Sequence, residues 1–230
     1  MSREVYAALE AQMLQYQDIA GIPVESNNEP LVALVQSPTL VAHQLRDEML
    51  SITGDKIYVR ETVARMLGAV SIQLDSQVPG TQLQVGYGYR ALSIQKTNFD
   101  RQRARLQGTV PDSELDAATH RYVAIPDIAA HPAGAAVDVR MLRGGEPVDC
   151  GTDMWEFIPD TYTFSPYVSR SARDNRLLLR SAMMGAGFAP FDGEWWHFSY
   201  GDKEWATYYD KPAAFYEQLE FSTNPDIRVQ

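Results

Sequence analysis

The chain has 230 residues, of which 45% are hydrophobic and 22% charged, and this composition excludes a disordered or fibrous protein. Thirty acidic against 20 basic residues give a formal net charge of −10, which argues against a nucleic acid partner because the chain would repel a polyanion. The single cysteine excludes an internal disulfide bond and a zinc cluster built on cysteines.

Two helices and a strand are predicted in the first part of the chain. Residues 2–17 have helical character with a mostly polar surface. A stronger helix is predicted over residues 58–74, because apolar side chains recur there at i, i+3, i+4 and i+7: Val63, Met66, Leu67 and Val70. After a turn at residues 78–80, alternating side chains predict a strand over residues 83–87.

A polar helix is predicted from just after Arg90 to about residue 106. It contains the basic run at residues 101–105, which we assign to a solvated helix face rather than to an anion site, because charged helix surfaces are the commoner case. Residues 108–134 are rich in turn-forming residues and predict a long irregular connection. Loops of this length inside a compact domain are often functional.

A strand, a helix and a hairpin are predicted in the last part of the chain. Residues 135–142 alternate as a strand, and residues 171–186 predict an amphipathic helix that ends at Gly187. A turn at residues 192–193 predicts a hairpin within residues 188–200. Helices and hairpins without regular strand–helix–strand alternation favour an α+β fold, in which helices flank a central antiparallel sheet.

No linker divides the chain, so we predict a single domain. The N-terminus lacks a basic segment that leads into an apolar run, and no stretch approaches 18 consecutive apolar residues. We therefore expect a cytoplasmic protein that does not insert into a membrane.

A histidine-based site can draw on only four residues: His43, His120, His131 and His197. His43 lies in a segment that predicts a helix, and His120 lies in the irregular connection, so we expect no role for either. His131 is followed seven positions later by Asp138, the only charge in the apolar run of residues 135–139, which must be paired or bound to a cation if it is buried. Gly134 allows a sharp turn that would bring both side chains to one point.

His197 follows Glu194 by three residues. In a regular strand this offset would point the two side chains to opposite faces, but the turn at residues 192–193 places Glu194 outside the strand, so the two can converge. Two histidines and one carboxylate suffice for a catalytic zinc ion, and Glu194 is then the candidate general base.

Spacing alone leaves a structural alternative equally open, in which Asp138 pairs with an arginine and His197 is hydrogen-bonded in a sheet. A Ser-His-Asp triad is disfavoured because the chain has no Gly-x-Ser-x-Gly segment, and Cys150 has no adjacent histidine.

Three segments carry a family resemblance. Residues 131–138 (His-Pro-Ala-Gly-Ala-Ala-Val-Asp) are similar to Ser-x-His-x-x-Gly-x-Ala-x-Asp, residues 194–197 (Glu-Trp-Trp-His) to Glu-x-Trp-His, and residues 87–90 (Tyr-Gly-Tyr-Arg) to Asp-Gly-Tyr-Arg-Pro. These are signatures of the zinc D-Ala-D-Ala metallopeptidase family, and they occur in the family's order. The chain most resembles the VanX-type D-alanyl-D-alanine dipeptidases of that family.

The resemblance implies one zinc ion per chain, bound by His131, Asp138 and His197. It implies that Glu194 is the catalytic base and that Arg90 stabilises the oxyanion. The implied protein is a zinc-dependent dipeptidase of peptidoglycan metabolism, whose partner is a small peptide substrate, D-Ala-D-Ala. One zinc peptidase domain would then span residues 1–230, with a mostly helical part at residues 1–80 and the catalytic core at residues 81–205.

Departures from the family pattern concern the groups that would anchor the substrate. Tyr87 stands where the arginine motif usually has aspartate. The family's Gly-Thr-Pro-Phe-Asp segment, whose aspartate would hold the substrate ammonium, reads Gly-Thr-Asp-Met-Trp at residues 151–155. We therefore expect substrate-binding roles for Asp153, Trp155 and Glu156, with Asp153 or Glu156 as the acid.

Two other functions remain open. The first is a D,D- or L,D-carboxypeptidase that trims cell-wall stem peptides and needs a longer groove. The second is a non-catalytic zinc-binding module, against which the presence of Glu194 and Arg90 argues, because a binding module needs no base.

Overall fold

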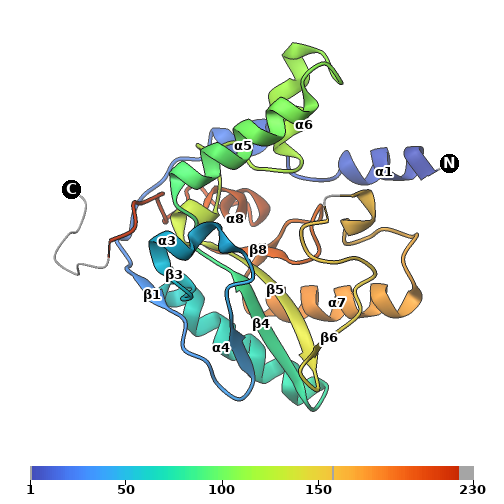
Figure 1. Ribbon diagram of the computed structural model, residues 1–230. Helices are drawn as coiled ribbons and strands as arrows, with labels where there is room; N and C mark the ends of the chain where they lie inside the picture. The colour runs from blue at the N-terminus through green and yellow to red at the C-terminus, as the bar shows by residue number, and fades with distance from the viewer. Residues whose placement is uncertain (1, 157, 223–230) are drawn as a thin grey trace.

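A computed structural model of the chain describes residues 2–156 and 158–222. A six-stranded sheet forms the centre of the molecule (Figure 1). Its strands, in order, are β2 (Leu40–Ala42), β4 (Thr81–Tyr87), β5 (Ala136–Arg143), β8 (His197–Ser199) and β7 (Ala189–Pro190), and β6 (Glu146–Pro147) pairs with the end of β5. All pairs are antiparallel except that of β2 with β4. The predicted α+β fold with a central antiparallel sheet is confirmed, with one parallel strand at its edge.

Helices α4 (Glu61–Gln77) and α7 (Arg170–Gly185) cover one face of the sheet and pack against each other (Figure 1). Their apolar sides meet the long strands in one core, whose buried side chains include Val63, Leu67, Val70, Leu74, Val139, Met141, Leu179 and Met183. The apolar spacing predicted for both helices is thus confirmed as a buried face. Gly187 ends α7 with a φ of 101°, as predicted, and Phe188 donates its N–H back to the Met183 carbonyl.

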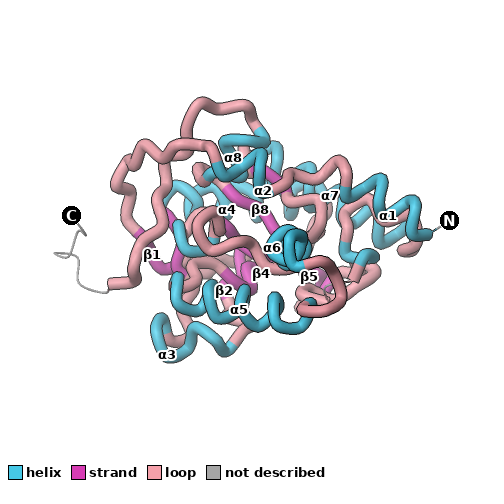
Figure 2. Tube along the Cα trace, turned by 90° about the horizontal axis from the view of Figure 1, so that it is seen from above, coloured by secondary structure: helices cyan, strands magenta, loops and turns pink. Residues whose placement is uncertain are grey.

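Helices α5 (Leu92–Leu106) and α6 (Leu115–His120) pack against each other beyond the end of β4. Figure 2, seen from above, shows them over the strands. The polar helix predicted after Arg90 is confirmed as α5. The wholly irregular connection predicted over residues 108–134 is wrong, because this segment contains α6 and two 3₁₀ turns, Asp112–Glu114 and His131–Ala133.

The first 80 residues contain three short strands that the sequence does not predict. β1 (Leu31–Ala33) pairs with β3 (Tyr58–Arg60), so the helix predicted from residue 58 begins only at Glu61. The helix predicted around His43 is wrong: this residue follows β2 directly and donates its backbone N–H to the Val85 carbonyl. Each of these strands is three residues long, too short to show a periodic pattern.

The remaining helices are short. The single helix predicted over residues 2–17 is two helices, α1 (Ser2–Glu10) and α2 (Tyr16–Ala20). Helix α3 (Leu50–Thr53) follows a 3₁₀ turn, and Asp202 caps α8 (Lys203–Tyr208) by accepting two backbone N–H groups. No helix in residues 2–156 and 158–222 is long and apolar enough to cross a bilayer.

The predicted hairpin near the C-terminal end is confirmed. β7 and β8 pair antiparallel, and residues 191–196 connect them, which is a longer connection than the two-residue turn at Asp192 and Gly193 suggests. This connection carries Glu194 and leads directly into His197.

Candidate metal centre and active site

Asp138 lies on β5, the middle one of three paired strands. The strand register pairs it with His197 of β8 on one side and with Tyr87 of β4 on the other, where the pairing is shifted by a bulge. Its carboxylate is 2% exposed, and Oδ1 lies 3.1 Å from Nδ1 of His197 and 3.5 Å from Nε2 of His131. Strand pairing therefore brings together residues that are 59 positions apart in the chain.

His131 reaches the same point from the 3₁₀ turn that precedes β5. Gly134 ends this turn with φ 67° and ψ 15°, a left-handed conformation that confirms the predicted sharp turn. Nδ1 of His131 lies 2.7 Å from the carbonyl oxygen of Gly88. This contact assigns the ring proton to Nδ1, because a carbonyl oxygen can only accept, and it leaves Nε2 free to bind a cation beside Asp138.

The three side chains fit a metal ion. His131, Asp138 and His197 each offer one ligand atom, and these atoms lie within 4.8 Å of one another. Two imidazole nitrogens and one carboxylate oxygen form the donor set of a catalytic zinc site. Burial lowers the pKa of His131 to about 4, so this ring is neutral near pH 7, as a ligand must be.

His197 and Asp138 are coupled in the metal-free protein. Burial lowers the pKa of His197, but the hydrogen bond and charge of Asp138, together with the charge of Glu204, outweigh it and raise this pKa to about 9. Burial likewise raises the pKa of Asp138, but the two histidines outweigh it and hold that pKa well below its usual range. To hold a cation at this point, His197 would have to lose its ring proton, because a metal ligand must be neutral imidazole.

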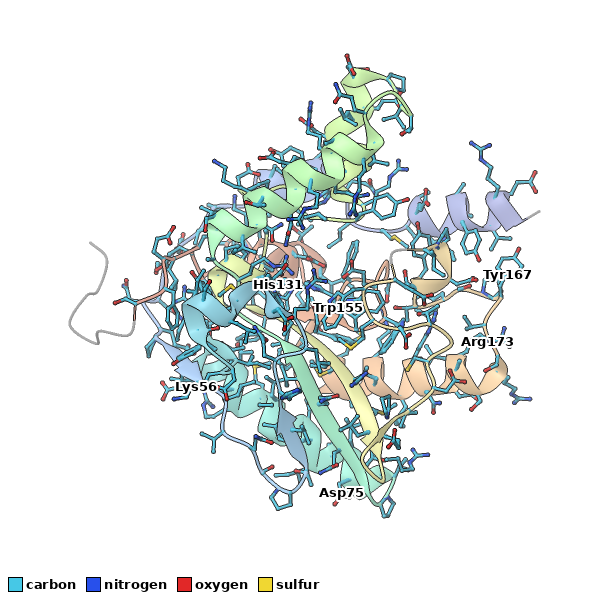
Figure 3. The ribbon with its side chains drawn as sticks, in the orientation of Figure 1. Lys56, Asp75, His131, Trp155, Tyr167 and Arg173 are labelled. Carbon is cyan, nitrogen blue, oxygen red and sulfur yellow. The ribbon has the colours of Figure 1, made fainter. Side chains whose placement is uncertain are left out.

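Trp155 holds the other oxygen of Asp138. Its indole Nε1 donates to Oδ2 at 2.8 Å, and the guanidinium of Arg46 lies 5.3 Å from the ring centroid. The backbone of Trp155 has a φ of 61°, which is uncommon for a bulky residue and is found where the surrounding structure enforces it. Trp155 and His131 line the same cavity in the centre of the molecule (Figure 3).

Glu194 lies beside the histidines because the chain turns before β8. His197 donates its backbone N–H to the Glu194 carbonyl at 3.1 Å, so residues 194–197 form a turn and not an extended strand. The spacing of three that would separate the side chains in a strand therefore brings them to one side. Burial raises the pKa of Glu194 to about 8, and the nearby charge of Asp138 adds to this effect.

Arg90 follows the end of β4 and is fixed by four groups. Its Nε lies 3.1 Å from the Tyr87 hydroxyl and 3.4 Å from Oε1 of Glu48, and its Nη1 donates to Gln95 at 2.7 Å. Its backbone N–H donates to the carbonyl of His131. The Tyr87 hydroxyl in turn donates to Glu48 at 2.6 Å, so the carboxylate beside Arg90 comes from Glu48.

A cavity of about 170 Å³ adjoins these residues. Six of the eight predicted site residues line it: Arg90, His131, Asp138, Trp155, Glu194 and His197. Asp153 and Glu156 instead line a separate depression beside Cys150, where the Asp153 backbone N–H donates to the Glu156 carboxylate at 2.9 Å. Trp155, which lies between these two acids, has a left-handed backbone and lines the central cavity, whereas the acids lie outside it.

Two acids near the site have no sequence signal. Glu48 comes from a 3₁₀ turn 42 positions before Arg90, and Glu204 comes from the first turn of α8, with Oε2 4.0 Å from Nε2 of His197. Neither lies in a motif. His120 also lines the cavity, but its Nδ1 accepts the backbone N–H of Ile125, while His43 is exposed.

An α+β fold that carries a His–Asp–His donor cluster, a buried glutamate and a fixed arginine in one cavity fits a metal-dependent hydrolase. Residues 43–217, well over half of the chain, match the D-ala-D-ala dipeptidase family of peptidases, and the chain belongs to this family. It is therefore a metallopeptidase with a peptidoglycan-related function.

Comparison with known proteins gives relatives of the same kind. The D-alanyl-D-alanine dipeptidase of Synechocystis sp. (strain ATCC 27184 / PCC 6803 / Kazusa) is 29% identical over an alignment of 231 positions. The alignment covers 87% of this chain and 94% of that protein. The D-alanyl-D-alanine dipeptidase of Escherichia coli (strain K12) is 29% identical over 157 residues, covering 64% and 72%. Among solved structures, the LD-carboxypeptidase LdcB is 20% identical with a TM-score of 0.47, covering 80% and 76%.

Proposed function

We propose that the chain is a zinc-dependent dipeptidase that hydrolyses D-Ala-D-Ala or a related small dipeptide in peptidoglycan metabolism. The observation that carries this proposal is the convergence of His131, Asp138 and His197 within 4.8 Å, in a cavity that Glu194 and Arg90 also line. Membership of the family and the D-alanyl-D-alanine dipeptidases among its relatives support the substrate.

His131, Asp138 and His197 would hold one zinc ion per chain. The chemistry that a bound zinc ion supplies is Lewis-acid polarisation and the acidification of water. Trp155 orients Asp138, and the Gly88 carbonyl orients His131. Such hydrogen bonds to metal ligands raise metal affinity. His197→Ala should abolish zinc retention and His43→Ala should preserve it; full zinc content in the His197 variant would contradict this ligand set.

Glu194 is proposed to be the general base. In its ionised form it accepts a proton from the attacking water and returns it to the leaving amine nitrogen. The pKa of about 8 belongs to the metal-free cavity, and a cation bound next to it lowers that pKa because it favours the carboxylate.

Arg90 is proposed to stabilise the negative charge that develops on the scissile carbonyl oxygen. Glu48, Tyr87 and Gln95 hold its guanidinium in place before the substrate arrives, so little reorganisation is needed during the reaction. Its side chain is 12% exposed, which places this charge in a poorly solvated wall.

The second candidate is a D,D- or L,D-carboxypeptidase, and the position of Asp153 and Glu156 favours it. Both acids lie outside the cavity, so neither meets a substrate ammonium there. The described acids that line the cavity are Asp138, Glu194 and Glu204, which are a ligand, the base and a neighbour of His197. A substrate whose amino group is acylated needs no carboxylate partner.

One substrate panel separates the two candidates. Zinc-loaded protein is given D-Ala-D-Ala, its N-acetyl form and the corresponding L,L-dipeptides, and release of the C-terminal residue is measured. A dipeptidase prefers free D-Ala-D-Ala, and a carboxypeptidase prefers the N-acetyl form. Asp153→Asn and Glu156→Gln should leave the KM for D-Ala-D-Ala unchanged. If zinc-loaded protein cleaves neither D,D-peptide, the proposed activity is wrong.

A further inference from the structure

Helix α5 forms one wall of the cavity, and its cavity side carries only amide and guanidinium groups. The α5 residues that line the cavity recur at helical spacing along the helix: Gln95, Asn98, Arg101, Gln102 and Arg105. The inner two are already engaged, since Gln95 holds Arg90 and Asn98 donates to Glu48. Arg101 and Arg105 lie at the outer end, where α5 rises away from the sheet (Figure 1).

These outer arginines differ from their neighbour Arg103. Arg103 turns to the opposite side of the helix and pairs with Asp116 at 2.6 Å. Within residues 2–156 and 158–222, neither Arg101 nor Arg105 has a carboxylate partner; Arg101 reaches only the amide oxygen of Asn98, at 3.4 Å. Because the chain carries a net charge of −10, two exposed arginines that line the cavity without a carboxylate partner among the described residues are a local feature that opposes the overall charge.

Arg121, which directly follows α6, lines the same cavity. Its side chain is 54% exposed, and its contact with Glu10 is loose, at 3.7 Å. Three guanidinium groups from two packed helical segments therefore line one cavity. A guanidinium fork binds carboxylates in pairs of parallel hydrogen bonds, so this arrangement is suited to an anionic group of a ligand.

The position of these arginines sets a length for that ligand. At 1.5 Å per residue, Arg101 and Arg105 lie about 14 Å and about 20 Å along the α5 axis from Leu92, which follows Arg90 closely. An extended dipeptide spans only about 7 Å. A dipeptide bound between Arg90 and the metal ligands therefore stops short of the outer arginines, and a longer peptide can reach them.

We propose that Arg101, Arg105 and Arg121 form an anion subsite that binds a carboxylate of a peptide substrate, remote from the scissile bond. This proposal rests on the second candidate function for the same cavity, the carboxypeptidase, because a dipeptidase admits no longer substrate. It reverses the assignment of the basic run to a solvated helix face for Arg101 and Arg105 and keeps it for Arg103. The preferred substrate is then an acidic peptide longer than a dipeptide.

The test compares two peptides of equal length. One is glutaryl-Gly-D-Ala-D-Ala, and in the other a carboxamide replaces the free carboxylate of the N-terminal glutaryl group. For zinc-loaded protein, we expect kcat/KM to be about tenfold higher for the carboxylate peptide. The Arg101→Gln/Arg105→Gln variant should reduce this ratio to about one, and Arg103→Gln, the matched control on the same helix, should keep it. A ratio that survives in the double variant, or that falls equally in the control, would overturn the subsite.

A binding measurement separates failure of the subsite from failure of the proposed activity. The dissociation constants of both peptides are measured with the zinc-loaded protein by calorimetry, which needs no turnover. Tighter binding of the carboxylate peptide that is lost in the double variant supports the subsite even if neither peptide is cleaved. Equal affinity for both peptides in the unmodified protein contradicts it.

Discussion

Asp138 satisfies two demands with its two carboxylate oxygens. Oδ1 faces both histidines, and Oδ2 accepts the indole N–H of Trp155. A buried carboxylate keeps its charge when hydrogen-bond donors or a cation compensate for the lost solvation. Trp155 therefore supports the ionised form of Asp138 and fixes its orientation, whereas the sequence resemblance leads to the expectation of a substrate-binding role.

Trp155→Phe tests this role. Phenylalanine keeps the aromatic ring but removes the donor to Oδ2, so we expect zinc affinity to fall by about 10–100-fold, as is typical when a partner of a metal ligand is lost. Competition with a chromogenic chelator measures the affinity. Trp195→Phe is the matched control, because that indole donates to Thr152 and not to a ligand; equal losses in both variants would show a general packing effect.

At the scale of elements, the turn from His131 into β5 sets the geometry of the site. Gly134 combines a left-handed backbone with a close approach to Leu31, and its carbonyl accepts the backbone N–H of Arg60. The buried Arg60 side chain also donates to the Ala133 carbonyl at 2.7 Å. Two hydrogen bonds from Arg60 of β3, one from its backbone and one from its side chain, thus hold the turn that carries His131.

Gly134→Ala should destabilise the fold more than Gly144→Ala. Both glycines have a positive φ, which costs a residue with a side chain about 1–2 kcal/mol, but only at position 134 would the new Cβ meet another residue. Urea denaturation gives the two free energies of unfolding. Equal losses would mean that crowding against Leu31 does not constrain the turn.

Local sequence patterns predict both the long elements and the candidate metal ligands. Periodic apolar residues mark α4, α7, β4 and β5, and the motif residues of the site lie on or beside β4, β5 and β8. The three-residue strands β1 to β3 are not predicted because they form by pairing with distant segments and show no local pattern.

The same limit applies to single residues of the site. Glu48 reaches Arg90 only through the packing of its 3₁₀ turn against β4, so nothing near it in the sequence marks it. Asp153 and Glu156 are expected at the substrate but line a separate depression, and Trp155 between them lines the cavity with a left-handed backbone. Such a conformation in a bulky residue cannot be anticipated from spacing.

At the scale of the whole molecule, protonation of the metal-free cavity affects stability. The folded pKa of His197, about 9, exceeds its ordinary value of 6.5, so its contribution is complete below pH 6.5 and is lost as the pH rises toward 9. The folded pKa of Glu194, about 8, exceeds its ordinary value of 4.5, so the folded state binds more protons between these values and loses stability as the pH rises. Both effects have the same sign between pH 6.5 and 8.

We therefore expect the melting temperature of chelator-treated protein to fall from pH 6.5 to pH 8. Zinc should remove this decline, because it binds neutral His197 and favours ionised Glu194. Thermal unfolding monitored by circular dichroism, with chelator or with zinc, measures both curves. A zinc-free protein that is more stable at pH 8 than at pH 6.5 would contradict the proposed protonation of the cavity.

The most direct test of the account measures zinc content and peptide hydrolysis together, in the unmodified protein and in Glu194→Gln. The substitution keeps the shape of the side chain and removes its basicity. We expect both proteins to bind one zinc ion per chain, and we expect the variant to release D-alanine from the better D,D-peptide substrate about 10²–10⁴-fold more slowly. Hydrolysis by the zinc-loaded variant at the rate of the unmodified protein would contradict the assignment of Glu194 as the base.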